Sequence, residues 1–476
     1  MRYQTGSALS RRLASLLVLV AACDASTEAA RDADPSAQNN AEQLQLESPP
    51  PADEPPQAAV AAVTTGAHAE APPPAPRTPI ATRIARQLLI VRAAPDHRAP
   101  MRARIPISES FHVYAYVEGP DCGGKGWGDV GDAAFVCLDP SRKGGDAVPR
   151  VLPELRDGDL APFYYAKVKA GQVARRWSTL ASWQSDEPHV DTLEQEHDYA
   201  FTNRRRVKRE IVLIDDRARV VLESEVTRYR PSRFEGRDLA ELPVPADKQL
   251  AWGITWPENP VLSEPREGAA AGVSIDYQAE ILIGPEPTVG PDGKWWATSG
   301  GWIHDKHLGH WSLPTVPADL ADDELWIDVE LDNQTLTVMR GPTPIFATLV
   351  STGFKGPTPK GLFRISMKQA IGQMQSRPDA EESYNVEAVP FVQYFAGNFA
   401  LHGAFWHYRF GHKISHGCVN LSPRDAKRVY DMTAPHAELG WLNVYEGEGA
   451  LGTTVRVRKG DGPVQDKRDV PRLFEG

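Results

Sequence analysis

Cysteine is scarce in this chain, with four among 476 residues, and the four are widely spaced. So low a content excludes a small scaffold held together by many disulfides. No CxxC pair and no HExxH sequence occurs, so the spacings of the common zinc sites are absent. Each of the four cysteines therefore needs its own explanation.

Long apolar runs and an excess of basic residues are also missing. The formal net charge is −11 and the pI is about 5.7, which argues against a general nucleic-acid-binding protein. Neither a phosphate-loop pattern nor the helix–strand alternation of a dinucleotide-binding fold appears. The longest apolar run, LASLLVLVAA, has ten residues, which is too short to cross a bilayer as a helix.

This short apolar run resembles the centre of an export signal. It follows several arginines and ends in VAAC, where small residues precede Cys23. Residues 1–23 thus resemble a bacterial lipoprotein signal peptide whose Cys23 becomes lipidated. An ordinary signal peptide with an incidental cysteine is the alternative. Residues 24–85 are rich in Ala, Pro, Glu and Gln and contain no aromatic residue, so we expect a disordered tether.

Export to an oxidising compartment decides what we expect of the other three cysteines. Cys122 and Cys137 flank a hairpin-like stretch, so we predict a disulfide between them, which would contribute about 3 kcal/mol. Cys418 is then expected to be unpaired, and a thiol in such a compartment is a liability unless it has a use. We expect the protein to be lipid-anchored in the periplasm or cell envelope.

The composition predicts a mainly β protein with many turns, because 38 glycines and 41 prolines occur without long amphipathic helical repeats. Between residues 86 and 320, stretches such as FHVYAYV and REIVLID are enriched in β-branched and aromatic residues. GDVGDAAFVCLD and PDGKWWATSGGWIHDKHL share one cadence and resemble the end of a Src-homology-3-like barrel. Four tryptophans are candidates for a ligand platform, with core packing as the favoured alternative: Trp295, Trp296, Trp302 and Trp311.

The C-terminal region, residues 322–459, is predicted to form a separate β domain. DELWIDVELDNQTLTVMRGPTPIFATLVSTG has the pattern of three strands and two turns, and its first strand alternates as a half-buried strand does. SPRDAKRVYDM predicts a helix with Ser422 as the N-cap and Pro423 at the first position. TTVRVRK is expected to be a final strand, followed by a flexible tail over residues 460–476.

The stretch ALHGAFWHYRFGHKISHGCVNLSP concentrates four histidines and a cysteine between His402 and Cys418. A zinc site and a histidine-rich structural core are two alternatives, and neither has a diagnostic spacing here. A nucleophile with its base fits better, because a thiol needs a base or a positive neighbourhood to ionise near neutral pH. Five Lys or Arg and one acid lie between His402 and Arg428, which suits a thiolate and an anionic substrate.

LHG followed by SHGCVN closely resembles the catalytic motif of L,D-transpeptidases of the YkuD type. That motif is a histidine followed, after a gap of a dozen or more residues, by [S/T]-H-G-C-x-[N/R]. The gap between His402 and Ser415 is 12 residues, at the short end for the family. PTPKGLF, YFAGNFALHG, SPRDAKRVYD and GTTVRV resemble the flanking segments of that domain. The resemblance covers residues 322–459 and implies a β-sandwich with short helices.

The resemblance implies catalytic roles for several residues. Cys418 matches the nucleophile, His402 matches the general base, and the carbonyl of Gly403 matches the group that orients this histidine. The backbone N–H groups of Gly417 and Cys418 match an oxyanion hole.

Further residues are assigned to shaping the site and binding the substrate. Ser415 and His416 match motif residues that shape the site, and His416 is expected to help stabilise the thiolate. Tyr394 lies in the stretch that lines the substrate cleft in relatives, and Arg409 belongs to the basic region. Asn420 stands where other members often carry arginine, and we place it with the substrate-binding residues.

The resemblance also implies a reaction on peptidoglycan stem peptides. The nucleophile attacks the L,D bond of a tetrapeptide stem, D-alanine leaves, and an amine of diaminopimelate or of a protein resolves the thioester. Members make 3→3 cross-links, attach proteins or admit water, and the sequence does not choose among these. We expect no metal, no cofactor and no nucleic acid, and contact with the membrane through the lipid anchor only. A non-catalytic peptidoglycan-binding lipoprotein remains an alternative.

Overall fold

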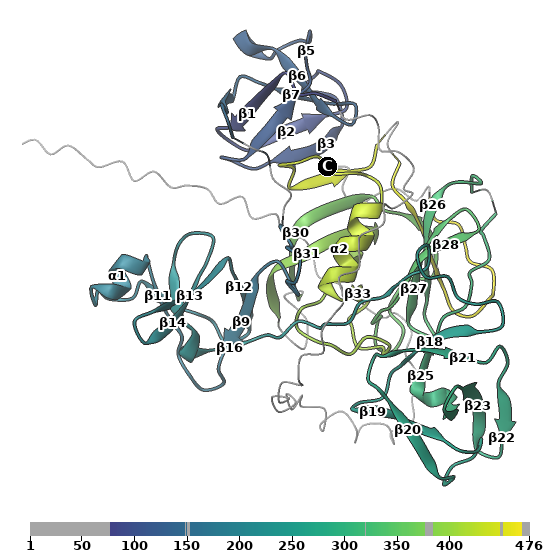
Figure 1. Ribbon diagram of the computed structural model, residues 1–476. Helices are drawn as coiled ribbons and strands as arrows, with labels where there is room; N and C mark the ends of the chain where they lie inside the picture. The colour runs from purple at the N-terminus through teal and green to yellow at the C-terminus, as the bar shows by residue number, and fades with distance from the viewer. Residues whose placement is uncertain are drawn as a thin grey trace, which may run out of the picture. The chain divides into compact units, whose positions relative to one another are not determined.

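The computed structural model describes residues 77–147, 149, 153–318, 320–376, 384–447 and 451–468. Within these ranges the chain is mainly β, as predicted, with two α-helices, α1 (Leu180–Gln184) and α2 (Pro423–Met432) (Figure 1). Cys23 and most of the predicted tether lie outside the described residues. No helix in the described part is long and apolar enough to span a membrane.

Residues 79–144, here called module 1, fold around a small core that also contains Trp441 and Val444 of the C-terminal domain. The strands are β1 (Ala81–Ala85), β2 (Leu89–Arg92), β3 (Met101–Ile105), β4 (Ser110–Val113), β5 (Ala115–Val117), β6 (Trp127–Gly131), β7 (Ala134–Cys137) and β8 (Ser141–Lys143). They pair in the orders β4–β1–β8 and β3–β2–β7–β6–β5. A disulfide joins Cys122 and Cys137 across this module, with Cα atoms 5.4 Å apart.

Residues 249–311, here called module 3, repeat the strand order of module 1. The strands are β18 (Gln249–Gly253), β19 (Glu258–Leu262), β20 (Ala271–Asp276), β21 (Glu280–Ile283), β22 (Thr288–Gly290), β23 (Gly293–Thr298), β24 (Gly301–His304) and β25 (Leu308–His310). Their orders, β21–β18–β25 and β20–β19–β24–β23–β22, match those of module 1 strand for strand. The two modules are therefore two copies of one architecture.

One glycine in each copy supports this equivalence. A Cβ on Gly119 would lie 2.2 Å from the carbonyl oxygen of Pro95 and 2.7 Å from the indole of Trp127. A Cβ on Gly290 would lie 2.4 Å from the carbonyl oxygen of Pro265 and 3.0 Å from the indole of Trp295. Each copy thus needs glycine where the chain passes close to a buried tryptophan.

The tryptophans proposed as a ligand platform lie mostly inside module 3 or beside it. Trp295, Trp296 and Trp311 are buried, and Trp302 is half-buried. The indole N–H groups of Trp295 and Trp296 donate to the carboxylates of Asp292 and Asp305. Core packing, the favoured alternative, accounts for these side chains.

Residues 164–228, here called module 2, separate the two copies and have a different strand order. The elements are β9 (Tyr164–Val168), β10 (Arg175–Trp177), α1, β11 (Asp191–Thr192), β12 (His197–Phe201), β13 (Asn203–Val207), β14 (Glu210–Ile214), β15 (Val220–Leu222) and β16 (Val226–Arg228). Five strands form the sheet β11–β10–β15–β14–β13, and β16–β9–β12 joins the C-terminal domain through a parallel pairing of β12 with β31.

The C-terminal domain packs two sheets face to face, which confirms the predicted β-sandwich. Its elements are β26 (Leu325–Glu330), β27 (Thr335–Arg340), β28 (Thr343–Leu349), β29 (Gly361–Arg364), β30 (Met367–Gln375), β31 (Asn385–Ala396), β32 (Phe399–Gly403), β33 (Val419–Leu421), α2, β34 (Asn443–Tyr445) and β35 (Thr454–Arg458). One sheet has the order β17–β28–β27–β26–β35–β29, where β17 (Arg237–Asp238) comes from the preceding connector. The second contains β30 to β34, and α2 packs against β31 and β32 (Figure 1).

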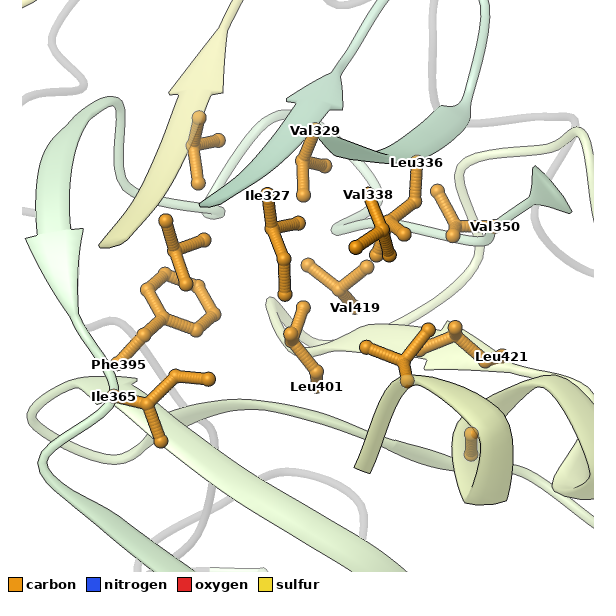
Figure 2. Packing of buried hydrophobic residues seen from close by; sticks show 14 of the residues in the cluster. Ile327, Val329, Leu336, Val338, Val350, Ile365, Phe395, Leu401, Val419 and Leu421 are labelled. Carbon is orange, nitrogen blue, oxygen red and sulfur yellow. The ribbon is translucent and has the colours of Figure 1, made fainter. Parts of the chain in front are cut away.

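Apolar side chains from both sheets fill the space between them. Figure 2 shows Ile327, Val329 and Val338 of the first sheet facing Leu401 and Val419 of the second. Close packing of this kind is the main favourable contribution to folding.

Strand β26 departs from the prediction of a half-buried strand, because it is buried on both faces. It lies between β27 and β35, and its second face carries Asp328, which is 2% exposed. The Asp328 carboxylate accepts from Arg456 Nε at 2.5 Å and from Arg458 Nε at 2.9 Å. Polar residues alternate along this strand because they form a buried ion-pair network, not because they face water.

The start of helix α2 agrees with the prediction from the sequence, whereas the C-terminal tail differs from it. Helix α2 begins as predicted, since the Ser422 side chain accepts from the Asp425 N–H and Pro423 follows it. The predicted flexible tail is instead partly bonded to the domain. The Leu362 N–H donates to the Gln465 carbonyl, and the Lys467 N–H donates to the Leu362 carbonyl.

Candidate active site

Two neighbouring strands bring the two halves of the histidine–cysteine stretch together. β32 and β33 are parallel, with His402 opposite Asn420 and Leu401 opposite Val419. Cys418 directly precedes β33. The 15 residues between these strands therefore form a loop, residues 404–418, whose ends are held side by side.

Alternation along the strands decides which side chains share a face. Leu401, Val419 and Leu421 point into the sandwich core in Figure 2. Because successive side chains alternate, His402 and Asn420 occupy the other face of the same pair of strands. Cys418, two residues before Asn420, packs on that face in a second cluster with Ala400, Tyr394 and Phe405.

His402 is buried, with 1% of its surface exposed, and its ring is oriented by the backbone. Its Nδ1 lies 3.4 Å from the carbonyl oxygen of Gly403, which can only accept, so Nδ1 carries the proton. Nε2 is then the basic nitrogen. Burial lowers the pKa of His402 to about 4, so the ring is neutral at neutral pH. The indole of Trp406 stacks on it at 5.6 Å.

Cys418 is 3% exposed, and its Sγ lies 3.8 Å from the carbonyl oxygen of Asn398. The expectation of an unpaired Cys418 is wrong for this structure. None of the cysteines in the described ranges carries a free thiol. Chemistry at this sulfur thus requires the reduced form.

The predicted oxyanion-hole donors are only partly available. Gly417 has φ of +139°, and a Cβ there would lie 2.5 Å from the ring of Phe399, so glycine is required. However, the Gly417 N–H donates to Ser415 Oγ at 3.0 Å. Ser415 Oγ donates in turn to the Cys418 carbonyl at 2.6 Å. Ser415 therefore braces the turn that carries Cys418, and the Gly417 N–H is engaged within it.

The remaining residues chosen from the sequence lie in different surroundings. His416 is exposed, and its ring stacks on Tyr384 at 5.4 Å. Tyr394 is 1% exposed within the cluster that contains Cys418, and burial raises its pKa. The backbone of Arg409 is fixed, since its carbonyl accepts from Ser351 Oγ at 2.6 Å. Its side chain is half-buried.

Module 2 and Tyr229, which directly follows it, also contribute to the cluster that contains Cys418, and the sequence did not indicate this. The ring of Tyr165 stacks on Phe405 at 3.5 Å, and Tyr229 meets Phe405 edge-on at 5.4 Å. The Tyr165 hydroxyl donates to the Ala388 carbonyl at 2.8 Å. Nothing in the local sequence around Tyr165 marks it as part of a site so distant along the chain, because the contact arises only from tertiary packing.

Module 3 holds the loop between the two halves of the site. Gln278 Nε2 donates to the Tyr408 carbonyl at 2.7 Å, and the Tyr277 hydroxyl donates to the same oxygen at 3.2 Å. His412 Nε2 donates to the Ile254 carbonyl at 2.8 Å. The His412 ring thus serves the loop and not the reacting atoms.

His407, to which the sequence assigned no role in the chemistry, forms a hydrogen bond within the site. It is 9% exposed and lies 2.9 Å from the Asn420 amide, measured from Nε2. In the sequence, only the position of His407 within the histidine-rich stretch could have indicated that it belongs to the site. No three His, Cys, Asp or Glu side chains are grouped to hold a metal ion in the described ranges.

Comparison with known proteins identifies the domain that carries this site. Residues 324–457 match the family model of the L,D-transpeptidase catalytic domain, YkuD. YciB of Bacillus subtilis (strain 168), which bears an L,D-transpeptidase name, is 24% identical over 141 residues, covering 25% of this chain and 67% of that protein.

Solved structures of L,D-transpeptidases are similar to part of this chain. The enzyme from Stackebrandtia nassauensis is 27% identical, with a TM-score of 0.21, over 30% of this chain and 60% of that one. A cysteine-to-serine mutant of the enzyme from Enterococcus faecium is 22% identical, with a TM-score of 0.22, over 28% of this chain and 50% of that one. This chain thus spans little more than half the length of these chains.

Proposed function

We propose that the L,D-transpeptidase catalytic domain in residues 324–457 is active and that reduced Cys418 is its nucleophile. The pairing of β32 with β33 supports this proposal, because His402 is opposite Asn420, and Cys418, two residues before Asn420, is expected on the same face. His402 keeps its proton on Nδ1, beside the Gly403 carbonyl, so Nε2 can take a proton from a thiol. The substrate class is the peptidoglycan stem peptide.

The first half-reaction transfers an acyl group to sulfur. His402 Nε2 removes the proton from the thiol, and Sγ attacks the carbonyl carbon of the third stem residue. The tetrahedral intermediate collapses with cleavage of the C–N bond, and imidazolium returns its proton to the departing amine of D-alanine. A thioester on Cys418 and free D-alanine result, with no change of oxidation state.

The second half-reaction transfers the acyl group from sulfur to an amine. The amine attacks the thioester carbon, His402 accepts its proton, and the C–S bond breaks. A diaminopimelate side chain as acceptor gives a 3→3 cross-link, and a protein amine gives attachment. Water in the same place gives a carboxylic acid, so the hydrolase alternative differs only in the acceptor.

The location of the protein belongs to the same proposal. The N-terminal signal with Cys23, followed by the tether, supports export and lipid anchoring at the envelope, where peptidoglycan lies. Modules 1 and 3 are proposed to be the Src-homology-3-like copies suggested by the sequence. Their shared strand order supports this, and they would act as spacers or wall-binding elements.

Purified protein treated with a mild reductant tests the reaction. We expect release of D-alanine from a tetrapeptide muropeptide, and cross-linked dimers when acceptor stems are present. Cys418→Ala and His402→Gln should abolish release, whereas His189→Gln, at an exposed position, should not.

Other outcomes would favour the alternatives. Tripeptide without dimers would indicate the hydrolase. Wall binding without any product would indicate a binding protein, and loss of activity with a chelator but not with iodoacetamide would refute the cysteine mechanism.

A further inference from the structure

A buried histidine outside the base–nucleophile pair contacts two groups whose roles can be worked out. His407 Nδ1 lies 3.2 Å from the backbone N–H of Arg409, which donates to it. On the other side of the ring, Nε2 lies 2.9 Å from the side-chain amide of Asn420. Both residues are buried, His407 being 9% exposed and Asn420 3% exposed.

The backbone contact fixes the tautomer of His407. A backbone N–H can only donate, so Nδ1 is the acceptor and carries no proton. The neutral ring must then hold its proton on Nε2. Burial, together with nearby His402 and Arg409, lowers the pKa of His407 to about 3, which is consistent with a neutral ring.

The tautomer in turn fixes the orientation of the Asn420 amide. Nε2–H is a donor, so the amide atom that faces it must be the acceptor Oδ1. Facing it with the amino group Nδ2 would put two donors together. The opposite atom of the amide has no hydrogen-bond partner within the described part of the chain. When Oδ1 faces His407, that unpartnered position holds the amino group.

The strand pairing determines on which face of the sheet this amino group lies. Asn420 is opposite His402 in the parallel pair, and its side chain shares a face with His402 and Cys418. Its backbone cannot shift readily, since the Asn420 N–H donates to the Ser351 carbonyl and the Ser351 N–H donates to the Asn420 carbonyl. A buried donor is therefore fixed beside the proposed reacting groups.

We propose that His407 is a positioning residue that orients the Asn420 amide so that its amino group donates to an oxygen of the bound peptide. This inference rests on the proposed function, because the ligand is the stem peptide that Cys418 would attack. The geometry explains how an amide can donate to the peptide at a position where other members of the family often carry arginine. His407 prevents the amide from turning over, so one donor is always directed to the peptide.

The tautomer can be measured without any activity. Ring ¹⁵N chemical shifts of labelled protein, assigned with His407→Phe, should show His407 with its proton on Nε2. A proton on Nδ1 would overturn the proposal, since Asn420 Nδ2 could then donate to Nε2 and the unpartnered position would hold the amide oxygen, an acceptor.

The role of the amide is tested by peptide binding in the Cys418→Ala background, where no turnover occurs. Asn420→Asp keeps an acceptor for His407 but removes the donor, so we expect tetrapeptide affinity to fall about tenfold or more. His407→Phe should weaken binding about threefold to tenfold, and adding it to Asn420→Asp should have little further effect, because His407 acts through Asn420.

Two controls separate this proposal from a structural role and from failure of the proposed function. The rate of iodoacetamide alkylation of reduced Cys418, a reaction that needs no bound peptide, should be unchanged in His407→Phe, which adds no charge beside the sulfur. Equal losses from His407→Phe in both backgrounds would mean a structural role and would overturn the inference.

If the protein binds tetrapeptide but Asn420→Asp binds it equally well, the inference fails while the proposed function stands. If wild-type protein neither binds nor turns over the peptide, the proposed function fails as well.

Discussion

The chemistry of the site depends on His402 being neutral in a buried place. An exposed histidine has a pKa near 6.5, and desolvation lowers that of His402 to about 4 because the charged ring loses its hydration. The Gly403 carbonyl partly opposes this shift by accepting from Nδ1. The ring is thus ready to accept a proton over most of the pH range in which the protein would work.

The first prediction concerns the pH dependence of the reaction. Since His402 is protonated only near pH 4, the acid limb of kcat/KM for release of D-alanine should lie near that value, with activity retained at about pH 5.5. A limb near 6.5 would show that His402 is hydrated in the working enzyme. His402→Gln should lower kcat by about 100-fold to 10,000-fold by removing the base.

Among the secondary-structure elements, α2 ties the connector that precedes module 3 to the catalytic domain. Asp425, in the first turn of α2, is 2% exposed and accepts from the Gly236 N–H at 3.0 Å and from Thr348 Oγ1 at 2.6 Å. Burial raises the pKa of Asp425 to about 6 in spite of these donors. A carboxylate at this place therefore costs folding free energy when it is charged.

The second prediction gives the sign of this effect. The folded pKa of about 6 exceeds the unfolded value of 3.8, so the folded protein binds the additional proton between these values. The stabilisation is complete below pH 3.8 and is lost as the pH rises through 6. At about 1.4 kcal/mol for each pH unit, the change is about 3 kcal/mol.

Urea unfolding of the wild type and of Asp425→Asn at about pH 4 and about pH 7 measures this difference. Relative to the wild type, the variant should gain about 2.5 kcal/mol in unfolding free energy between these two pH values, because the unfolded carboxyl is already partly ionised at about pH 4. The comparison cancels the contributions of His402 and His407, whose lowered pKa values make stability rise with pH. A constant difference between the two proteins would show that Asp425 does not titrate in this range.

The sequence predicted much of the C-terminal domain because its signals are local. Ser422 and Pro423 mark the start of α2, and the turns at DNQ and GPTP separate β26, β27 and β28. The burial of Asp328 was missed, because alternation alone cannot tell solvent from an ion pair with Arg456.

For the site, the spacing of motifs gave His402 and Cys418 but not their surroundings. The contacts of Tyr165 with Phe405 and of Gln278 with Tyr408 join segments that are far apart in the sequence. Contacts between such distant segments produce no periodic pattern in the sequence. The tautomer argument for His407 also needed distances, since four histidines in one stretch look alike until their partners are known.

At the scale of the whole molecule, module 3 packs against the C-terminal domain. Trp252 and Leu250 of module 3 share a hydrophobic cluster with Leu349 and Phe410 of the catalytic domain. Phe410 lies in the loop between His402 and Cys418, so this cluster and the hydrogen bond from Gln278 hold the loop from outside the domain.

The third prediction tests this bracing. Gln278→Ala removes the 2.7 Å hydrogen bond to the Tyr408 carbonyl and should increase amide hydrogen exchange over residues 404–412. Because the loop carries Cys418 at its end, kcat should fall severalfold, while overall unfolding changes by about 1 kcal/mol. Ser274→Ala, at an exposed position of the same module, is the matched control. Unchanged exchange in this loop would mean that module 3 does not hold it.

The most direct test of the central claim is intact-mass and peptide-mapping mass spectrometry of the reduced protein, quenched in acid during reaction with a tetrapeptide stem. The account predicts a thioester-linked tripeptide acyl group on Cys418, formed with release of D-alanine and absent from Cys418→Ala. Release of D-alanine by Cys418→Ala, or an acyl group on any other residue, would contradict it.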